Sequence, residues 1–294
     1  MVQVARRDPE TTAAVLVEAI PYIRRFSGAV VVVKVGGAAL ASAAEDGGSM
    51  LGGFAQDVVL ARSVGMLPVV VHGGGPQIGD LMKRLGKTPE FVEGHRVTDA
   101  ETLDIARMVL VGKVNRDIVG ALNVHAPLAV GLSGEDGGFI VATERDPSLG
   151  FVGDVESVDP VLLRHLLSEG LIPVVATIAS GSSGQAYNVN ADAVAGAIAE
   201  SLGATKLVYL TDVSGVRSDP ADEASALSRV TAEDLEALIN DGSITGGMLP
   251  KALSIARAVR KGVAAGHILD GRVPHALLVE LFTDSGVGTM VTAP

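Results

Sequence analysis

The sequence predicts an α/β fold built on a parallel sheet. Two stretches of β-branched residues without polar alternation, 30–35 and 68–72, are typical of strands that are buried on both faces. Each stretch ends in a glycine-rich turn, Gly36-Gly37 after the first and Gly73-Gly74-Gly75 after the second. Glycines at the carboxyl end of a strand let the backbone approach a ligand and turn its N–H groups toward an anion. Because Lys34 lies next to the first turn, the sequence indicates a protein that handles phosphate.

The amino-terminal residues are expected to form a helix that ends near Phe26. Asp8 is a favoured N-cap, Pro9 fits the first turn, and apolar residues recur at helical spacing as far as Phe26. Pro21 is expected to bend this helix. A helix before the first strand has no obligatory place in a sheet, so packing on its own chain and contact with another subunit both stay open.

After the first strand, helices and strands alternate as they do in β-α-β units. We expect helices over residues 50–63, 76–85, 99–123 and 160–169, the third of them capped by Thr98 or Asp99. Strands are expected at 30–35, 68–72, 129–132 and 172–177, with a region rich in glycine and aspartate over 134–157 that favours a hairpin.

A second lobe is expected to start near Asn188. Its predicted helices cover 191–202, 231–240 and 248–261, and Thr231 caps the middle one. Its predicted strands are 206–211, 267–269 and 289–291. The sequence shows no internal repeat, low-complexity tract or flexible linker, so we expect the two lobes to share one continuous sheet.

The composition argues against several classes of function. The chain has 294 residues and a net charge of −11, which disfavours a general nucleic-acid binder. It has no cysteine, so disulfides, thiolate zinc sites and cysteine nucleophiles are excluded. Its six histidines lack metal-ligand spacing, and no metal site is predicted. Apolar runs end well before the ~20 residues of a membrane span, and no secretory signal is found, so a soluble cytoplasmic protein without membrane contact is expected.

Gly86-Lys87-Thr88 looks like the end of a Walker A motif but does not fit one. The motif needs a glycine five residues before Gly86, where this chain has Leu81, and no predicted strand leads into it. A glycine at the carboxyl end of the helix 76–85 explains Gly86 better. A G-x-G-x-x-G fingerprint is also absent from the sequence, so phosphate must be held in another way.

Two lysines and one aspartate are the strongest candidates for catalysis. Lys34 stands at the carboxyl end of a predicted strand, although an exposed strand-end lysine would look the same in the sequence. Lys251 lies in the first turn of a predicted helix, where a cation is unfavourable unless it meets an anion there. Asp192 could orient both lysines through charge-assisted hydrogen bonds.

Other polar residues at predicted strand and helix ends are candidate ligand contacts. Asn188 and Asn190 could bind polar atoms of a substrate, although one of these residues is expected to cap the following helix. Arg96 could clamp a carboxylate, or it could be a surface arginine of a hairpin. Asp212 ends a strand where ligands meet open α/β sheets, or it forms a simple Asx turn.

Nothing in the sequence resembles a nucleophile paired with its base. Phosphorylation of a carboxylate needs neither, because a carboxylate is already ionised and nucleophilic at neutral pH. The obstacle is repulsion between two anions, which lysines, backbone N–H groups and Mg²⁺ relieve. The candidate residues fit that chemistry.

Together these segments resemble the amino acid kinase family, and within it the N-acetylglutamate kinases, over essentially the whole chain. The matching stretches are 34–37, 72–78, 94–99, 131–136, 187–192, 210–215 and 246–251. The resemblance implies a three-layer α/β/α sandwich with a central, mainly parallel sheet and an added N-terminal helix. It also implies transfer of the γ-phosphoryl group of ATP, with Mg²⁺ carried by the nucleotide, to the side-chain carboxylate of N-acetyl-L-glutamate, the second step of arginine biosynthesis.

The resemblance assigns roles to residues by position. Lys34 and Lys251 would stabilise the transferring group, and Asp192 would organise both lysines. The substrate would be bound by Gly74, Gly75, Arg96, Asn188 and Asn190. ATP would be held by Gly36, Gly37, Asp212, Val213, Gly215, Thr245 and Gly247. Residues 28–187 would bind acetylglutamate and form a dimer contact, and residues 188–294 would bind the nucleotide.

The amino-terminal helix resembles the extra helix of the arginine-sensitive branch of the family. In that branch the helix links dimers into a hexamer, a trimer of dimers, and L-arginine binds between it and the second lobe. Residues 1–27 would then serve oligomerisation and regulation, and feedback inhibition by arginine is expected. The positions that match the arginine site are Tyr22, Lys206, His267, Glu280 and Gly286.

The chain departs from the family pattern at Ala38, where Asn or Ser is usual, and at Leu40, where Met is common. Two other functions stay open. One is a kinase for a longer acid such as an amino-protected 2-aminoadipate, since one carbon is worth only ~1 to 3 kcal/mol in a pocket. The other is a catalytically silent arginine sensor, although all three candidate catalytic residues are present.

Overall fold

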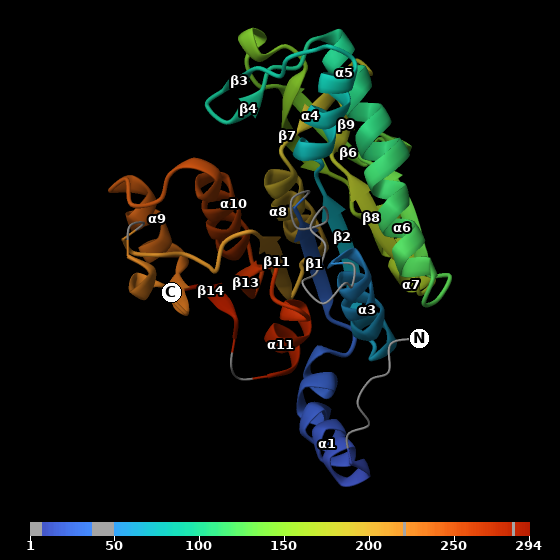
Figure 1. Cartoon of the computed structure of the whole chain (residues 1–294), viewed down its shortest axis with the longest axis vertical. Coiled ribbons are helices and arrows are strands. Elements are labelled where there is room, and N and C mark those ends of the chain that lie inside the picture. Colours follow the sequence, from blue (N-terminus) through green and yellow to red (C-terminus); the bar gives the residue numbers. More distant parts are fainter. Residues whose placement is uncertain (1–7, 37–49, 220–221, 284–285) are drawn as a thin grey trace.

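The chain folds around an eight-stranded sheet, as a computed structural model shows for residues 8–36, 50–219, 222–283 and 286–294 (Figure 1). The strand order is β12-β14-β13-β11-β1-β2-β8-β5. In that order the strands span Arg229–Thr231, Gly288–Thr292, Ala265–Asp270, Lys206–Thr211, Val30–Val35, Leu67–His72, Ile172–Ala176 and Ala129–Ser133. Neighbouring strands are parallel except β13 and β14, which are antiparallel. The predicted α/β fold with a mainly parallel sheet is confirmed.

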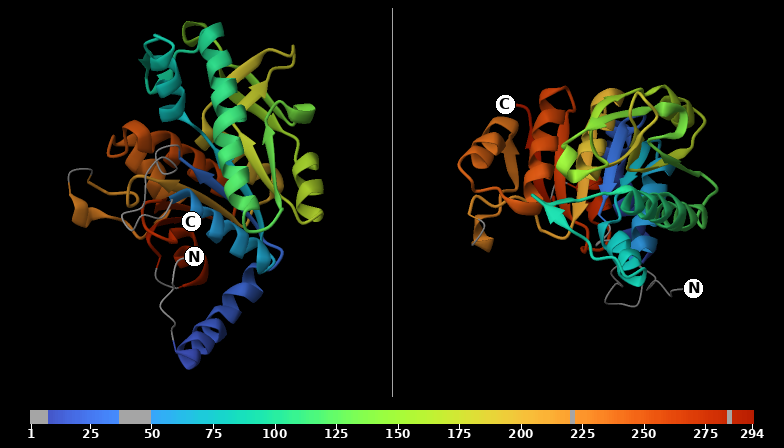
Figure 2. Two further views of the ribbon diagram at one scale, coloured as in Figure 1. Left: turned by 45° about the vertical axis from the view of Figure 1, so that its right-hand side comes forward. Right: turned by 90° about the horizontal axis from the view of Figure 1, so that it is seen from above.

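Helices cover both faces of this sheet and give the molecule three layers (Figures 1 and 2). Successive residues of β1 point to opposite faces, so Val31 and Val33 join one apolar core and Val32 joins the other. The first core is completed by α3 (Met50–Ser63), α4 (Gly75–Arg84), α5 (Ala100–Arg107), α6 (Asn115–Asn123) and α11 (Ala276–Phe282). The second is completed by α7 (Val161–Ser168), α8 (Ala191–Leu202), α9 (Ala232–Asn240) and α10 (Leu249–Arg260). Burial on both faces explains the unbroken valine runs.

Strand β1 joins the two halves of the chain. On one side it pairs with β2, Val30 opposite Leu67, and on the other with β11, Val31 opposite Lys206. The expectation that both lobes share one continuous sheet is therefore confirmed. The carboxyl ends of these strands, where Lys34 and His72 lie, meet at one edge of the sheet.

A small closed barrel lies at one end of the sheet, in the upper part of Figure 1. It consists of β6 (Ile140–Glu144), β7 (Val152–Val158), β9 (Ile178–Ser180) and β10 (Ala186–Val189). The hairpin expected over 134–157 corresponds to the antiparallel pair β6–β7, whereas the two shorter strands are missing from the prediction. A two-stranded hairpin, β3 (Phe91–Val92) and β4 (His95–Arg96), adjoins this end of the molecule.

The helix expected over 99–123 is interrupted in its middle. It consists of α5, a π-helical segment η1 (Met108–Val114) and α6, which continue one another along the side of the molecule (Figure 2). Asp99 caps this rod as predicted, because its side chain accepts a hydrogen bond from the N–H of Thr102 at 2.8 Å. The prediction of a single α-helix was wrong, since π turns are set by local packing.

The remaining predicted elements occur within two residues of their expected bounds. Helix α1 (Pro9–Phe26) starts at Asp8 as predicted, with the side chain of Asp8 accepting from the N–H groups of Glu10 and Thr11. Strand β12 and helix α11 were not predicted from the sequence. Among the described residues, no helix combines the length and the apolarity that crossing a membrane requires.

Candidate active site

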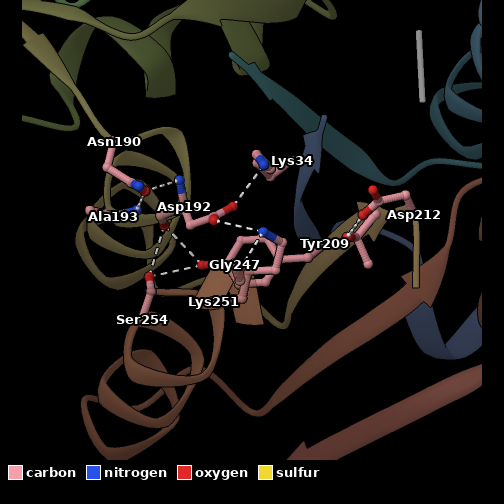
Figure 3. A network of polar contacts seen from close by, with 10 residues as sticks. Lys34, Asn190, Asp192, Ala193, Tyr209, Asp212, Gly247, Lys251 and Ser254 are labelled. Atoms are coloured by element: carbon pink, nitrogen blue, oxygen red, sulfur yellow. Dashed lines mark hydrogen bonds and ion pairs between the residues drawn. The ribbon is translucent and has the colours of Figure 1, made fainter. Parts of the chain in front are cut away.

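Lys34, Asp192 and Lys251 meet at the carboxyl edge of the sheet, as Figure 3 shows. Lys34 Nζ lies 2.8 Å from Asp192 Oδ1, and Lys251 Nζ lies 3.2 Å from Asp192 Oδ2. The three residues come from β1, α8 and α10, so more than 200 residues of sequence separate the two lysines. The structure therefore brings together the three candidates for catalysis.

Local structure explains how each of the three side chains reaches this point. Lys34 is on the central strand of the sheet and is largely buried. Asp192 lies in the first turn of α8, whose N-cap Asn190 accepts hydrogen bonds from the N–H groups of Asp192 at 2.8 Å and Ala193 at 3.2 Å. Lys251, in the first turn of α10, also donates to the carbonyl of Gly247 at 3.0 Å.

The charges at this point favour an ionised carboxylate. Burial alone would raise the pKa of Asp192, but the two ammonium groups outweigh that effect and hold its pKa below the usual range. Each ammonium group has three N–H donors, and the carboxylate contact occupies only one of them. The lysines can therefore donate to an incoming anion while Asp192 keeps them in place.

A cavity of about 250 Å³ opens beside this group. Its volume is below the usual range for drug-sized ligands, roughly 300 to 1,000 Å³, so it suits a small acceptor rather than a whole nucleotide. The predicted substrate residues Gly74, Gly75, Arg96, Asn188 and Asn190 all line it. Its other walls are Lys34, Gly73, Ile78, Phe91, Gly94, His95, Leu110, Val152, Thr177, Val189, Ala191 and Asp192.

Arg96 reaches the cavity from the hairpin β3–β4. Its Nη2 donates to the carbonyl of Gly75 at 2.8 Å, and its guanidinium carbon lies 4.7 Å from the centre of the Phe91 ring. The amide nitrogen of Asn188, on β10, lies 3.4 Å from the hydroxyl of Thr98. These contacts hold a cation against the glycine turn and an amide beside Thr98 in the lining of the cavity.

Within the glycine turn at the start of α4, position 74 has no room for a side chain. A Cβ added at Gly74 would lie 2.7 Å from a methyl carbon of Leu110 and 3.2 Å from one of Val114, both on the π-helical segment. Helix α4 begins at Gly75, so the free N–H groups of its first turn border the cavity. Such an end favours an anionic ligand group.

His72, which is buried, supports the same turn through a hydrogen bond to Gly73. The amide nitrogen of Asn115 can only donate, so His72 Nε2 accepts at 3.1 Å and Nδ1 donates to the carbonyl of Gly73 at 3.0 Å. Burial lowers the pKa of His72 to about 4, so the ring is neutral at pH 7. This network was not foreseen in the sequence, where His72 is only the last residue of a strand.

The residues expected to hold ATP lie apart from the cavity. Asp212 and Val213 are exposed after β11, and Thr245 precedes the single turn 246–248. Gly215 has a φ of +137°, and a Cβ there would lie 2.6 Å from the hydroxyl of Thr289, so the turn after β11 requires glycine. Gly36 donates to the carbonyl of Leu210 at 3.3 Å, and Gly247 contacts Lys251. Gly37, Ala38 and Leu40 lie outside the described residues.

The five residues matched to an arginine site also come together. They lie at a second cavity, of about 830 Å³, near the amino ends of β11 and β13. Tyr22, Lys206, Glu280 and Gly286 line it. His267 joins two of them, because its Nε2 lies 3.0 Å from Lys206 Nζ and its Nδ1 lies 2.7 Å from Glu280 Oε1. The cavity is larger than the first but lies at the opposite ends of the strands, away from the catalytic candidates.

The electrostatics of this second cavity are mixed. Burial lowers the pKa of Lys206, although Glu280 partly offsets that effect. Burial would raise the pKa of Glu280, but His267 and Lys206 hold it below its usual value. A buried carboxylate beside a buried ammonium suits a ligand that has both signs of charge.

The described residues contain no cluster of side chains that suits a metal ion. No group of three or more His, Cys, Asp or Glu side chains there could hold a metal ion. Both oxygens of Asp192 already face ammonium groups.

The chain is similar to known proteins over nearly its whole length. The model of the amino acid kinase family matches residues 29–270. Acetylglutamate kinase of Symbiobacterium thermophilum is 53% identical over 288 residues, covering 95% of this chain and 97% of the relative. Acetylglutamate kinase of Acidothermus cellulolyticus is 51% identical over 293 residues, with coverages of 96% and 97%.

Solved structures share the fold of this chain. N-acetylglutamate synthase of Neisseria gonorrhoeae, in complex with coenzyme A and L-arginine, superposes with a TM-score of 0.82 at 27% identity. The match covers 96% of the present chain and 65% of the synthase. Carbamate kinase of Giardia lamblia bound to AMP-PNP has a TM-score of 0.69 at 17% identity, covering 91% of this chain and 99% of that one, and this likeness concerns the fold alone.

Proposed function

The chain belongs to the amino acid kinase family, and from this premise we propose that it phosphorylates the side-chain carboxylate of N-acetyl-L-glutamate with ATP. The observation that carries the proposal is the bridge that Asp192 makes between Lys34 and Lys251 beside a small cavity. The names of relatives at about 50% identity over nearly the full chain support the choice of acceptor. The product, an acyl phosphate, would be that of the second step of arginine biosynthesis.

The proposed reaction is an in-line displacement at the γ-phosphorus. An oxygen of the acceptor carboxylate forms a bond to phosphorus while the bond from phosphorus to the oxygen of the leaving ADP breaks. No base is needed, because the acceptor is ionised at neutral pH. Lys34 and Lys251 are placed to neutralise charge on the phosphoryl oxygens, and Asp192 holds both ammonium groups.

The acceptor would lie in the 250 Å³ cavity with its backbone carboxylate near Arg96. The N–H groups at the start of α4 and the amide of Asn188 would bind its remaining polar atoms. Asn190 lines the cavity too, but its side-chain oxygen already caps α8, which leaves only its amide nitrogen for a ligand. The nucleotide with its Mg²⁺ would lie against the residues after β11 and before α10.

We further propose that L-arginine inhibits the enzyme from the 830 Å³ cavity, and that α1 assembles dimers into a hexamer. Tyr22 of α1 and Lys206, Glu280 and Gly286 of the second lobe line this cavity together. In this assignment residues 1–27 serve assembly and regulation, 28–187 bind the acceptor, and 188–294 bind the nucleotide. The expected cytoplasmic location stays a prediction.

The test is formation of acyl phosphate, trapped as the hydroxamate, with ATP and each of two acceptors. N-acetyl-L-glutamate and N-acetyl-2-aminoadipate are compared, each with and without arginine. We expect preference for the glutamate derivative and suppression by arginine. Preference for the longer acid would replace the acceptor in this proposal, and no product from either would favour a catalytically silent sensor.

A further inference from the structure

We propose that Tyr209 and Ser254 are positioning residues. They hold Asp192, and through it the two lysines, in the arrangement that phosphoryl transfer requires. The inference rests on the proposed function and adds two side chains that touch neither phosphate nor acceptor in that assignment. Both act on the main chain of Asp192 rather than on its carboxylate (Figure 3).

Three oxygen atoms from three elements form a closed triangle behind the carboxylate. The Tyr209 hydroxyl, on β11, lies 2.9 Å from the carbonyl oxygen of Asp192 and 2.8 Å from Ser254 Oγ. Ser254 Oγ, on α10, lies 2.8 Å from the same carbonyl oxygen of α8. The triangle ties one strand of the sheet to both helices that contribute catalytic candidates.

The tyrosine end of this triangle is permanently a donor. Tyr209 is completely buried, and burial first and the charge of Asp192 second raise its pKa well above 10. Its proton therefore stays on the hydroxyl at any pH at which the protein would be assayed. A buried hydroxyl without a partner is costly, so the triangle resists opening.

Ser254 connects the triangle directly to Lys251. The two residues are three positions apart on α10 and so lie on the same face of that helix, one turn from each other. The contact from Ser254 Oγ to the carbonyl of Asp192 therefore helps to set the separation between α8, which contributes the carboxylate, and α10, which contributes the lysine. The distance from Lys251 Nζ to Asp192 depends on that separation.

A glycine on α8 makes this approach possible. A Cβ added at Gly196 would lie only 2.2 Å from Ser254 Oγ, whereas the next nearest atoms, the carbonyl oxygen and Cβ of Ser254, would be 3.4 and 3.5 Å away. The hydroxyl of Ser254 thus occupies the space that any side chain at position 196 would need. Glycine there permits the contact with Asp192.

The first test compares Ser254→Ala and Tyr209→Phe with the wild-type chain in the hydroxamate assay. We expect kcat to fall roughly tenfold to a hundredfold, the loss expected for a displacement of about 1 Å, while KM for ATP and for the acceptor stays unchanged. Ser201→Ala is the matched control, because it removes a hydroxyl bonded to a carbonyl of the same helix α8, that of Ile198, at the far end from Asp192. Its kcat should equal that of the wild type.

A pH profile separates positioning from mere stability. Because the lysines hold the pKa of Asp192 down, a displaced carboxylate should regain protons more easily. The acidic limb of the kcat profile should therefore move to higher pH in Ser254→Ala and stay in place in Ser201→Ala. Thermal midpoints measured on the same samples show that each variant is folded at the assay temperature.

A double-mutant cycle gives the sharpest outcome. Gly196→Ala should lower kcat in the wild-type background, because its methyl group displaces the Ser254 hydroxyl. In the Ser254→Ala background the same change should cost little, because only ordinary van der Waals contacts remain. Additive losses would overturn the positioning role, and so would a Ser254→Ala enzyme with wild-type kcat.

Failure of the proposed function has a different signature. If the wild-type chain forms product with the longer acid instead, the same ratios are measured with that acceptor and decide the inference equally. A wild-type chain that forms no product from either acceptor would overturn both proposals. An active wild type with active, pH-unshifted variants would overturn only this one.

Discussion

Asp192 is almost fully removed from water, and each of its oxygens faces an ammonium group. An isolated carboxylate in such a place would be costly, but the two lysines compensate for its lost hydration. Lys34, Asp192 and Lys251 together then have a net charge of +1. A phosphoryl group in transfer would meet that charge, so the resting site is prepared for added negative charge.

Removal of one lysine should therefore affect the reaction far more than the fold. Lys251→Ala should lower kcat by about 10² to 10³, the range typical for loss of one donor to a developing negative charge. Lys261→Ala, at the exposed end of the same helix, is the matched control and should stay near wild type. Steady-state rates measure both. Near-normal turnover of Lys251→Ala would contradict the assigned role, as would a failure of this variant to bind arginine.

Most of this site could be predicted from the sequence because its members end a strand just before a glycine turn or lie in the first turn of a helix. Lys34, Asp192 and Lys251 occupy such positions, and short polar residues there are informative. Tyr209 and Ser254 gave weaker signals. Tyr209 looks like an ordinary buried residue of a strand, and Ser254 is a serine within a helix. Their importance depends on the angle between elements, which periodicity does not encode.

At the scale of the element, helix α8 depends on its cap. Asn190→Ala should reduce the free energy of unfolding by about 1 kcal/mol, because two N–H groups lose their acceptor. Thr231→Ala removes the cap of α9, far from the lysines, and should cost a similar amount. Only the first change should lower kcat, since only α8 contributes Asp192. Urea unfolding and turnover are measured on both, and equal turnover in the two variants would contradict this view.

Helices α3 and α11 are linked by a buried acid and a half-exposed histidine. Asp57 Oδ1 lies 2.5 Å from His275 Nδ1, and burial raises the pKa of Asp57 to about 6, partly offset by the histidine. The folded chain thus holds this proton more tightly than the unfolded chain does. The resulting stability is complete below pH 3.8 and is lost as the pH rises through about 6.

The rise in pKa from 3.8 to about 6 corresponds to about 3 kcal/mol. Compared with Asp57→Asn, the wild-type chain should therefore lose up to that amount of unfolding free energy between pH 4 and pH 7. Asp117→Asn, which alters an exposed pair with Lys113, should show no such trend. Denaturant titrations at several pH values measure the difference, and a flat difference for Asp57→Asn would refute the effect.

Long elements were predictable and short ones were not. The runs in β1, β2 and β11 are buried on both faces, and the helices α3 and α8 are long enough for capping and composition to define them. Strands β9, β10 and β12 have three or four residues each, too few for alternation to stand out. In the rod α5–η1–α6 the buried residues continue at steps of three or four through the π segment, so periodicity gave no sign of it.

At the scale of the whole molecule, α1 presents an apolar surface that the described residues of its own chain do not cover. Val15, Leu16, Val17 and Ile20 are between 41% and 65% exposed. Under the proposed assembly of dimers into a hexamer through α1, Leu16→Glu should yield a dimer and weaken the proposed inhibition by arginine, with catalysis retained. Val124→Glu, at an exposed residue after α6, is the control. Light scattering gives the masses, and an unchanged mass for Leu16→Glu would exclude α1 as the contact.

The strand that connects the two lobes has a mechanical consequence. Because β1 is paired in register with β2 on one side and with β11 on the other, the described part of the sheet joins the two lobes without a break. Any opening between the two lobes therefore has to deform a hydrogen-bonded sheet. The stiffness of the central strands should therefore limit how far the two lobes can move relative to each other.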